Sequence, residues 1–261
     1  MSYEKIIFGH ENGVAKITLN SKKNLNALDE SLASDLMNGL DECEKNPDIK
    51  AVVINGAGKG FCGGGDIAAM YKLIDEGNGF DKLIEKVVEI AIKIKKMPKP
   101  VIASVHGPVA GAGFSLALAC DFCIAAENAL FLEAFVKLGL VPDTGGVYLL
   151  TKAVGASKAY ELALTGKKIS AKEVFDLGII SELCSIEELE AKTNKFALKM
   201  AKGPAVAYKN IKELIYKSQF SDFEEYAKAE VKAQIECSKT EDFKEGLKAF
   251  LEKRKPNYVG R

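Results

Sequence analysis

The chain has 261 residues, of which 48% are hydrophobic, and its 36 basic and 36 acidic side chains give a formal charge of zero. This size and composition suit a globular protein, and the balanced charge argues against a nucleic-acid-binding protein, which normally carries a basic excess. No apolar stretch is long enough to cross a bilayer, and residues 1–7 lack the organisation of a signal peptide, so we expect a cytoplasmic protein that does not bind membranes.

A hairpin and a helix begin the predicted fold. Ile6–Phe8 and Val14–Leu19 have the composition of strands, and Glu11-Asn-Gly13 between them is typical of a hairpin turn. The loop Asn24–Leu28 follows. Leucines then recur every four residues, which predicts a helix from Asp29 to Lys45.

The first glycine-rich loop follows a short apolar strand, Ala51–Asn55. The loop covers Gly56–Gly65, and Asp66 is a plausible N-cap for a helix that begins there. A second, amphipathic helix is predicted over Phe80–Met97 and is ended by Pro98-Lys-Pro100.

A second copy of this arrangement comes next. The strand Val101–Val105 leads into the small-residue loop His106–Gly113, and Phe114–Cys120 has helical composition. Each junction exposes unpaired backbone N–H groups at the positive end of a helix dipole. Two such loops on neighbouring strands could direct two donors at one oxygen, which is what stabilising an enolate requires.

The rest of the chain changes from mixed structure to helix. We expect strands at Asp121–Ala126, Ala129–Phe131 and Ile179–Leu183, and helices at Val147–Lys152, Ser157–Leu164 and Ser170–Leu177, the last with a Ser170/Glu173 capping box. Four further helices are predicted at Ile186–Ala201, Val206–Ser218, Asp222–Cys237 and Glu241–Glu252. This predicts an α/β core over residues 1–200 and a helical module over residues 201–261.

The six cysteines do not form a paired framework, which favours free thiols in a reducing compartment. One Cys-x-x-Cys with no second ligand pair is a weak zinc signal, so core thiols are the simpler interpretation and no metal is expected. The cysteines are Cys43, Cys62, Cys120, Cys123, Cys184 and Cys237.

The sequence lacks the complete motifs of a dinucleotide-binding site, a phosphate-binding P-loop and a serine hydrolase. The glycines at 111 and 113 lack the third glycine of a dinucleotide fingerprint, because Leu116 occupies that position, and no Gly-Lys-Ser/Thr follows either loop. Ser115 lies in a turn similar to a nucleophile elbow, but both histidines precede it, which disfavours serine hydrolysis.

Four acids lie near the two loops: Glu133, Asp143, Asp66 and Asp121. Asp66 is expected to cap a helix, and Asp121 to end a helix or begin a strand. In Val141–Gly146, Asp143 is by local chemistry a turn or cap residue. Its apolar approach could also raise its pKa and make it a usable base.

Taken together, the motifs resemble the crotonase (enoyl-CoA hydratase/isomerase) superfamily over nearly the whole chain. The segments that carry this resemblance are Asn24–Leu28, Gly60–Ile67, Lys99–Ala103, Gly107–Gly113, Leu138–Gly146, Gly166–Glu173, Asp176–Gly178 and Phe243–Gly246.

The resemblance implies a crotonase-like spiral of ββα turns with a C-terminal helical trimerisation module, and a homotrimer or dimer of trimers. It implies an acyl-CoA substrate, with coenzyme A as part of that substrate and no separate cofactor. The backbone N–H groups of Gly65 and Ala112 would hold the thioester oxygen. The basic tail Lys253–Arg261 would reach the CoA phosphates. CoA would lie against Lys23, Leu25, Ala27, Gly63, Gly64, Asp66 and Ile67.

One departure from the family pattern bears on the reaction. Ser115 and Phe135 occupy the positions of the two hydratase glutamates, and Asp143 occupies the position of the isomerase carboxylate. The run Ala134–Asp143 is most similar to the ring-1,2-epoxyphenylacetyl-CoA isomerase and Δ3-Δ2-enoyl-CoA isomerase branch. A 3-enoyl-CoA to 2-enoyl-CoA isomerase is therefore expected, with Phe135 excluding water. Alternatives are a ring-epoxide isomerase, an atypical hydratase, or a non-catalytic acyl-CoA-binding subunit.

Overall fold

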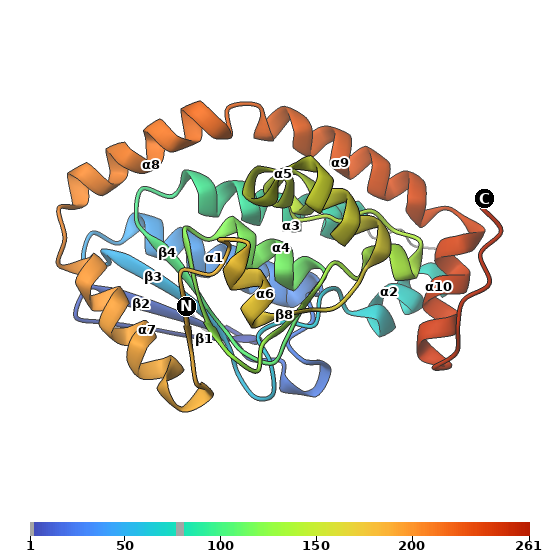
Figure 1. Ribbon diagram of the computed structural model, residues 1–261, viewed down its shortest axis with the longest axis horizontal. Helices are drawn as coiled ribbons and strands as arrows, with labels where there is room; N and C mark the ends of the chain where they lie inside the picture. Colours follow the sequence, from blue (N-terminus) through green and yellow to red (C-terminus); the bar gives the residue numbers. More distant parts are fainter. Residues whose placement is uncertain (1–2, 77–80) are drawn as a thin grey trace.

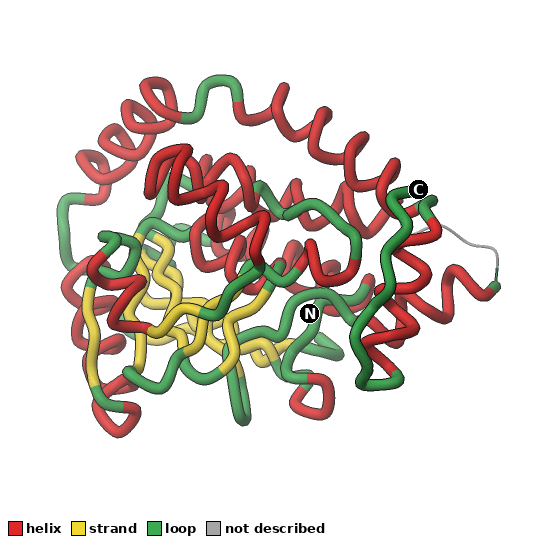
Figure 2. Tube along the Cα trace, turned by 45° about the vertical axis from the view of Figure 1, so that its right-hand side comes forward, coloured by secondary structure: helices red, strands yellow, loops and turns green. Residues whose placement is uncertain are grey.

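The fold is built on two sheets, as seen in a computed structural model that describes residues 3–76 and 81–261. The larger sheet has six strands in the order β1-β2-β3-β4-β6-β9, and the smaller has the order β5-β7-β8. Figure 2 shows the strands gathered on one side of the molecule and the helices packed around them. The strands are β1 (Ile6–Glu11), β2 (Val14–Leu19), β3 (Ala51–Gly56), β4 (Val101–Val105), β5 (Pro108–Ala110), β6 (Phe122–Ala126), β7 (Leu130–Leu132), β8 (Ile169–Ser170) and β9 (Glu182–Cys184).

The larger sheet separates two apolar cores. Side chains of a strand alternate between the two faces of the sheet. On β3, Val52 and Ile54 belong to the main core, whereas Val53 belongs to a smaller core beneath α7. On β4, Ile102 faces that smaller core as well. The central strands are therefore buried on both faces, as their continuous apolar sequences predict.

Ten α-helices and two short 3₁₀ helices complete the described part of the chain. The α-helices are α1 (Glu30–Lys45), α2 (Ile67–Asp75), α3 (Asp81–Lys96), α4 (Ala112–Ala119), α5 (Gly146–Thr165), α6 (Ala171–Asp176), α7 (Ile186–Ala201), α8 (Ala205–Gln219), α9 (Phe223–Ser238) and α10 (Glu241–Leu251), and the 3₁₀ helices are η1 (Lys22–Asn24) and η2 (Phe135–Leu138).

Local capping chemistry sets several boundaries where the sequence predicts them. Asp29 accepts from the N–H of Leu32 at the start of α1, and Asp66 accepts from Ala69 at the start of α2. Ser170 and Glu173 form the expected capping box of α6. The β1–β2 hairpin is confirmed, with its turn at Asn12-Gly13.

Several expectations differ from the structure. The strand expected at Ile179–Leu183 is the shorter β9. The second glycine loop contains a short strand, β5, and α4 begins at Ala112 rather than Phe114. The two helices expected between residues 147 and 164 form the single element α5, which is interrupted where Gly155 has φ 76° and ψ 162°. Of the helix expected over Phe80–Met97, Phe80 lies outside the described residues.

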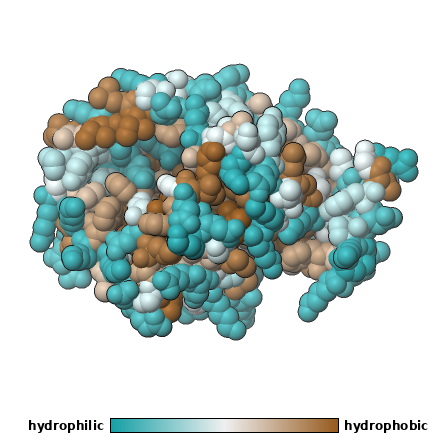
Figure 3. Space-filling model, in the orientation of Figure 1, coloured by the Kyte–Doolittle hydropathy of each residue, from teal (hydrophilic) through white to brown (hydrophobic). Residues whose placement is uncertain are grey.

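Helices α8 and α9 form an arc over the rest of the molecule, and α10 and the C-terminus lie at one end, beside α2 (Figure 1). Helix α8 carries exposed apolar side chains, among them Val206, Leu214 and Ile211. In Figure 3, which has the orientation of Figure 1, the surface over α8 at the upper left is largely brown. Assembly into trimers and a domain boundary at residue 200 remain predictions.

Candidate active site

The two glycine loops lie against each other. The N–H of Cys62 donates to the carbonyl of Pro108 at 3.2 Å, and the N–H of Ala110 donates back to the carbonyl of Cys62 at 3.0 Å. This approach requires a glycine at position 113, because a Cβ there would lie 2.5 Å from the Cys62 carbonyl oxygen. The neighbouring strands β3 and β4 thus deliver both loops to one place.

Each loop leaves a backbone N–H unpaired at this place. Ala112 is the first residue of α4, and its N-cap Gly111 has φ 51°, a conformation that favours glycine. Gly65 is the last residue of the first loop, directly before Asp66, the N-cap of α2. In the part of the chain that the structure describes, neither the N–H of Gly65 nor that of Ala112 has a hydrogen-bond partner.

Gly65, Ala112 and Asp143 line one small cavity. Its remaining lining is apolar: Leu28, Met70, Leu83, Ile84 and Val87. The cavity measures about 10 Å³, which is barely room for one water molecule. The Met70 side chain covers Gly65, so an acyl group can enter only if apolar side chains of α2 and α3 move.

Asp143 is the polar side chain of this cavity, and it is only 5% exposed. Its Oδ1 accepts from the Thr144 hydroxyl at 2.9 Å, and its Oδ2 accepts from Gln234 Nε2 at 3.0 Å. Burial raises the pKa of Asp143 to about 6, and the two hydrogen bonds oppose that rise. Its carboxyl can therefore both accept and return a proton near neutral pH.

Helix α9 supplies two buried residues that sequence reasoning missed. Gln234 donates to Asp143, and Glu230 accepts from the N–H of Gly145 at 2.8 Å. Glu133, which the sequence places among the candidate acids without a role, is 1% exposed beside them. Burial raises the pKa of both glutamates to about 8, and Asp143 adds to the rise.

Ser115 and Phe135 lie outside the cavity that contains Asp143. Ser115 is fully buried inside α4, and its hydroxyl donates to the Gly111 carbonyl at 3.4 Å. The Phe135 ring lies beside Gly111, 3.6 Å from where a Cβ would be. Neither residue lines the cavity that holds Asp143.

The residues expected to hold CoA surround the first loop. The N–H of Gly63 donates to the Leu25 carbonyl at 2.8 Å, and the Gly64 carbonyl accepts from Leu28 at 2.7 Å. Ala27 is buried, and Asp66 also accepts from the Asn24 amide at 2.7 Å. Ile67 is half-buried at the start of α2, and Lys23 is exposed on η1. That CoA lies against these residues remains a prediction.

Buried Asn26, which the sequence analysis passed over, organises that loop. Its amide nitrogen lies within hydrogen-bond distance of the carbonyls of Ala57, Gly60 and Phe61, at 2.9, 3.0 and 3.2 Å. Its side-chain oxygen accepts from the N–H of Ser21 at 2.8 Å. One side chain thus ties the turn after η1 to the first glycine loop.

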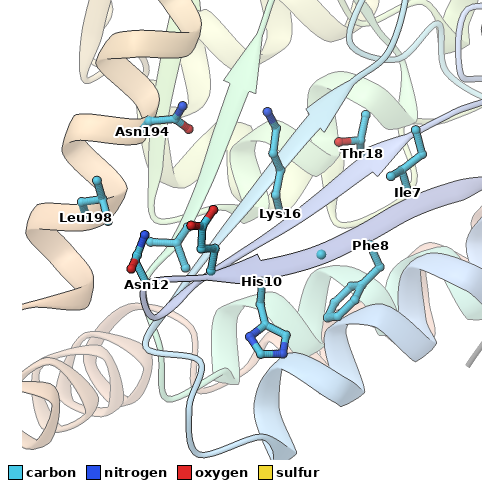
Figure 4. Close-up of a pocket in the computed structure, with 11 residues that line it drawn as sticks. Ile7, Phe8, His10, Asn12, Lys16, Thr18, Asn194 and Leu198 are labelled. Atoms are coloured by element: carbon cyan, nitrogen blue, oxygen red, sulfur yellow. The ribbon is translucent and has the colours of Figure 1, made fainter.

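A larger hollow of about 510 Å³ lies elsewhere, between β1, β2 and α7. Figure 4 shows Lys16 and Thr18 on its strand side, Asn194 and Leu198 on α7, and His10 pointing away from α7. It contains none of the candidate site residues.

Of the six cysteines, Cys237 is half-buried and the others are buried. Cys120 and Cys123 are buried free thiols, and burial raises the pKa of Cys123 to about 12. Over residues 3–76 and 81–261, no group of three or more His, Cys, Asp or Glu side chains could hold a metal ion. Within the same residues, none of the helices is both long and apolar enough to traverse a bilayer.

Comparison with known proteins gives a consistent match over the whole chain. The family model described as enoyl-CoA hydratase/isomerase matches residues 9–261. The chain is 36% identical to a trans-2-decenoyl-[acyl-carrier-protein] isomerase of Streptococcus mutans, over 100% of both chains. It is 34% identical to a 1,2-epoxyphenylacetyl-CoA isomerase of Escherichia coli, over 98% of this chain and 99% of the other.

Among solved structures, an enoyl-CoA hydratase from Mycobacterium avium subsp. paratuberculosis superimposes with a TM-score of 0.91. The two sequences are 32% identical, and the alignment covers 99% of this chain and 100% of that one. The resemblance drawn from the motifs is thus confirmed for the fold, whereas the relatives include both hydratases and isomerases.

Proposed function

The chain belongs to the enoyl-CoA hydratase/isomerase family, the crotonase superfamily, and from this we propose that it is one of the isomerases. It moves the double bond of a 3-enoyl thioester to the 2-position. Asp143 carries the proton, and the N–H groups of Gly65 and Ala112 hold the thioester oxygen.

The observation that carries this proposal is the lining of the small cavity. Of the described residues around it, Asp143 alone contributes a polar side chain, and it faces the same space as the two unpaired N–H groups. A reaction that needs one acid/base group and one oxyanion site fits this lining. A reaction that needs a second group to orient water does not.

The proposed reaction consists of two proton transfers. Asp143 removes a proton from C2, and the electron pair of that C–H bond delocalises through C1 to the thioester oxygen and through the C3–C4 double bond. The resulting dienolate carries its negative charge on the oxygen that faces Gly65 and Ala112. The carboxyl then returns the proton to C4, which leaves the double bond between C2 and C3. No water is consumed, and the same steps run in reverse.

The two N–H groups supply much of the stabilisation. Removing one donor from a comparable oxyanion site costs about 3–4 kcal/mol, or 10²–10³-fold in rate. Both donors here are backbone groups held by the contact between the loops, so they need no reorganisation when the charge forms. The apolar lining strengthens their interaction with the dienolate, because it keeps water away.

Hydration is disfavoured on the same grounds. The positions that resemble the two hydratase glutamates hold Ser115, whose hydroxyl is directed at a carbonyl, and Phe135. Neither can act as a base. A ring-epoxide isomerase remains an alternative, because it also needs an enolate site. A non-catalytic acyl-CoA-binding subunit is the alternative of another class.

The carrier of the acyl group is a separate question. We take CoA as the carrier, in accordance with the family description. The Streptococcus mutans relative is named for an acyl-carrier-protein substrate, which makes a protein-bound thioester the second candidate. The same acyl chain presented on either carrier distinguishes the two.

The first test follows purified protein with 3-hexenoyl-CoA and crotonyl-CoA in D₂O, by ultraviolet absorbance and mass spectrometry. We expect conjugation of 3-hexenoyl-CoA without addition of water to crotonyl-CoA. Asp143→Asn lowers turnover at least about 10²-fold, the usual contribution of a general base, and leaves thioester binding intact. Asp176→Asn on α6, which changes an exposed acid, is the control.

Three outcomes contradict the proposal. Unchanged turnover in Asp143→Asn removes Asp143 from the mechanism. Rapid hydration of crotonyl-CoA identifies a hydratase. Binding of both thioesters, and of the same acyl chains on acyl carrier protein, without conversion favours a ring substrate or a non-catalytic subunit.

A further inference from the structure

The turn that carries Asp143 has an unusual backbone. Thr144 and Gly145, which directly follow Asp143, have φ of 59° and 75°, in the left-handed region. A β-branched residue such as Thr144 adopts that region only when its surroundings impose it. The conformation of this turn therefore depends on contacts from elsewhere in the chain.

Gln234 supplies two of those contacts. Its Nε2 donates to Asp143 Oδ2 at 3.0 Å, and its Oε1 accepts from the N–H of Val141 at 3.1 Å. Its side chain has no exposed surface. One amide therefore links the carboxyl of Asp143 to the backbone two residues before it, which fixes both the side chain and the turn.

Two other residues of α9 support the end of the turn. Glu230, one helical turn before Gln234, accepts from the N–H of Gly145 at 2.8 Å. Phe223 packs so closely that a Cβ on Gly145 would lie 2.5 Å from its ring. The Phe223 ring in turn stacks on Tyr148 at 4.7 Å between centroids. Helix α9 thus holds Val141–Gly145 at both ends and at the carboxyl.

We propose that Gln234 is a positioning residue for Asp143: its amide sets the orientation of the Asp143 carboxyl and favours the charged form by donating a hydrogen bond to it. The proposal deepens the proposed function and rests on it, because it assumes that Asp143 is the base. It adds a residue, on a helix outside the two oxyanion loops, that controls the proton-transfer group without touching the substrate.

The electrostatic part of the argument concerns the groups around Asp143. Two donors face its oxygens, Thr144 Oγ1 and Gln234 Nε2. Two carboxyls share its surroundings, Glu133 from the segment after β7 and Glu230 from α9, and Tyr226 lies next to Glu230. The donors favour the charged form, whereas burial opposes it. Without Gln234, the pKa of Asp143 rises.

The experiment measures α-proton exchange of hexanoyl-CoA in D₂O between pH 5 and pH 9, by mass spectrometry. This saturated thioester has no double bond to move, so the readout reports proton removal alone. The variants are Gln234→Met, which keeps length and volume, and Thr144→Val, which removes the other donor. Glu236→Gln on the exposed side of α9 is the control.

In the wild type, the rate should rise with a midpoint near pH 6, as Asp143 loses its proton. Gln234→Met and Thr144→Val should each move that midpoint upward by about one pH unit. In both variants the exchange rate at pH 6 therefore falls several-fold relative to the wild type. The exchange rate at pH 9 falls less. Glu236→Gln keeps the wild-type profile.

A lower plateau with an unmoved midpoint in both variants shows a merely structural role and overturns the proposal. Unchanged profiles overturn it as well. If Gln234→Met does not fold by circular dichroism, Thr144→Val decides the electrostatic part. Wild-type exchange that survives Asp143→Asn instead contradicts the proposed function, so the two failures are distinguishable.

Discussion

Glu133 is a carboxyl in surroundings that do not suit a charge. It is 1% exposed, and within the described part of the chain neither of its oxygens has a hydrogen-bond partner. An ionised carboxylate in such a place is very unfavourable, and a group so placed keeps its proton instead. Burial first, and then Asp143 and Glu230, raise the pKa of Glu133 to about 8.

This pKa makes stability depend on pH in a definite direction. Between the ordinary carboxyl pKa and about 8, the folded protein holds a proton on Glu133 that the unfolded chain has released. Stability is therefore lost as pH rises through this window. Urea unfolding measures this effect. Between pH 5 and pH 8.5, the free energy of unfolding of Glu133→Gln should rise relative to that of the wild type by a few kcal/mol, on the order expected for a shift of several pKa units. An equal pH slope in both proteins would falsify the neutral state of Glu133.

At the scale of elements, the site depends on how closely two loops approach. Helix α4 can present the Ala112 N–H only because Gly113 lets its first turn lie on the Cys62 carbonyl. Two β-bridges, Cys62 with Val109 and Leu28 with Gly65, extend this contact around the first loop. The two proposed oxyanion donors, Gly65 and Ala112, are thus positioned by sheet-like pairing outside the main sheet.

Gly113→Ala should separate the loops. The new Cβ, 2.5 Å from a backbone oxygen, forces a shift that costs about 1–3 kcal/mol of stability and misaligns one donor. We expect isomerase activity to fall about 10²-fold while the melting temperature drops by several degrees. Gly9→Ala in β1, where a Cβ meets nothing within 4 Å, is the control. Full activity in Gly113→Ala argues against the pairing of Gly65 and Ala112.

The sequence predicts these elements where the determining chemistry is local. Asp29, Asp66 and Ser170 act within three residues of themselves, so their helix starts could be predicted. The glycine loops were predicted for the same reason. The two-residue β8 could not be, because pairing with β7 rather than its own composition makes it a strand.

Only part of the candidate site could be predicted from the sequence. Gly65, Ala112 and Asp143 come from motifs, and the structure brings them to one cavity. Glu230 and Gln234 lie on α9 in the stretch Glu224–Gln234, which is rich in charged and small residues and therefore resembles a solvent-exposed helix face. Glu230 and Gln234 are buried because α9 packs on α3 and on the Asp143 turn. The sequence near these two residues does not indicate that packing.

At the scale of the whole molecule, an ion pair joins α8 to the body of the protein. Lys212 pairs with Asp121, and both side chains are mostly buried. Lys212 also donates to the carbonyls of Ile94 and Lys99 at 3.3 and 3.2 Å. Asp121 meanwhile accepts from the N–H of Val101, at the start of β4. One lysine therefore joins α8 to α3, β4 and the end of α4.

Lys212→Met should destabilise the protein by about 1–3 kcal/mol, less than for a fully buried pair because some solvent reaches both groups. Lys217→Met on the same helix removes a solvent-exposed pair with Glu213 and should destabilise the protein less than Lys212→Met does. Urea titration of both variants measures the difference. Equal midpoints for the two variants rule out the special role of Lys212.

The contacts of α9 with the Asp143 turn also determine when this turn can form during synthesis of the chain. Gln234 lies 91 positions after Asp143, and Glu230 lies 85 positions after Gly145. A ribosome therefore completes both glycine loops and Asp143 long before α9 has emerged. Until α9 docks, the Asp143 turn lacks the hydrogen bonds from Gln234 and Glu230. The folded geometry of this turn thus forms only when these late long-range contacts have formed.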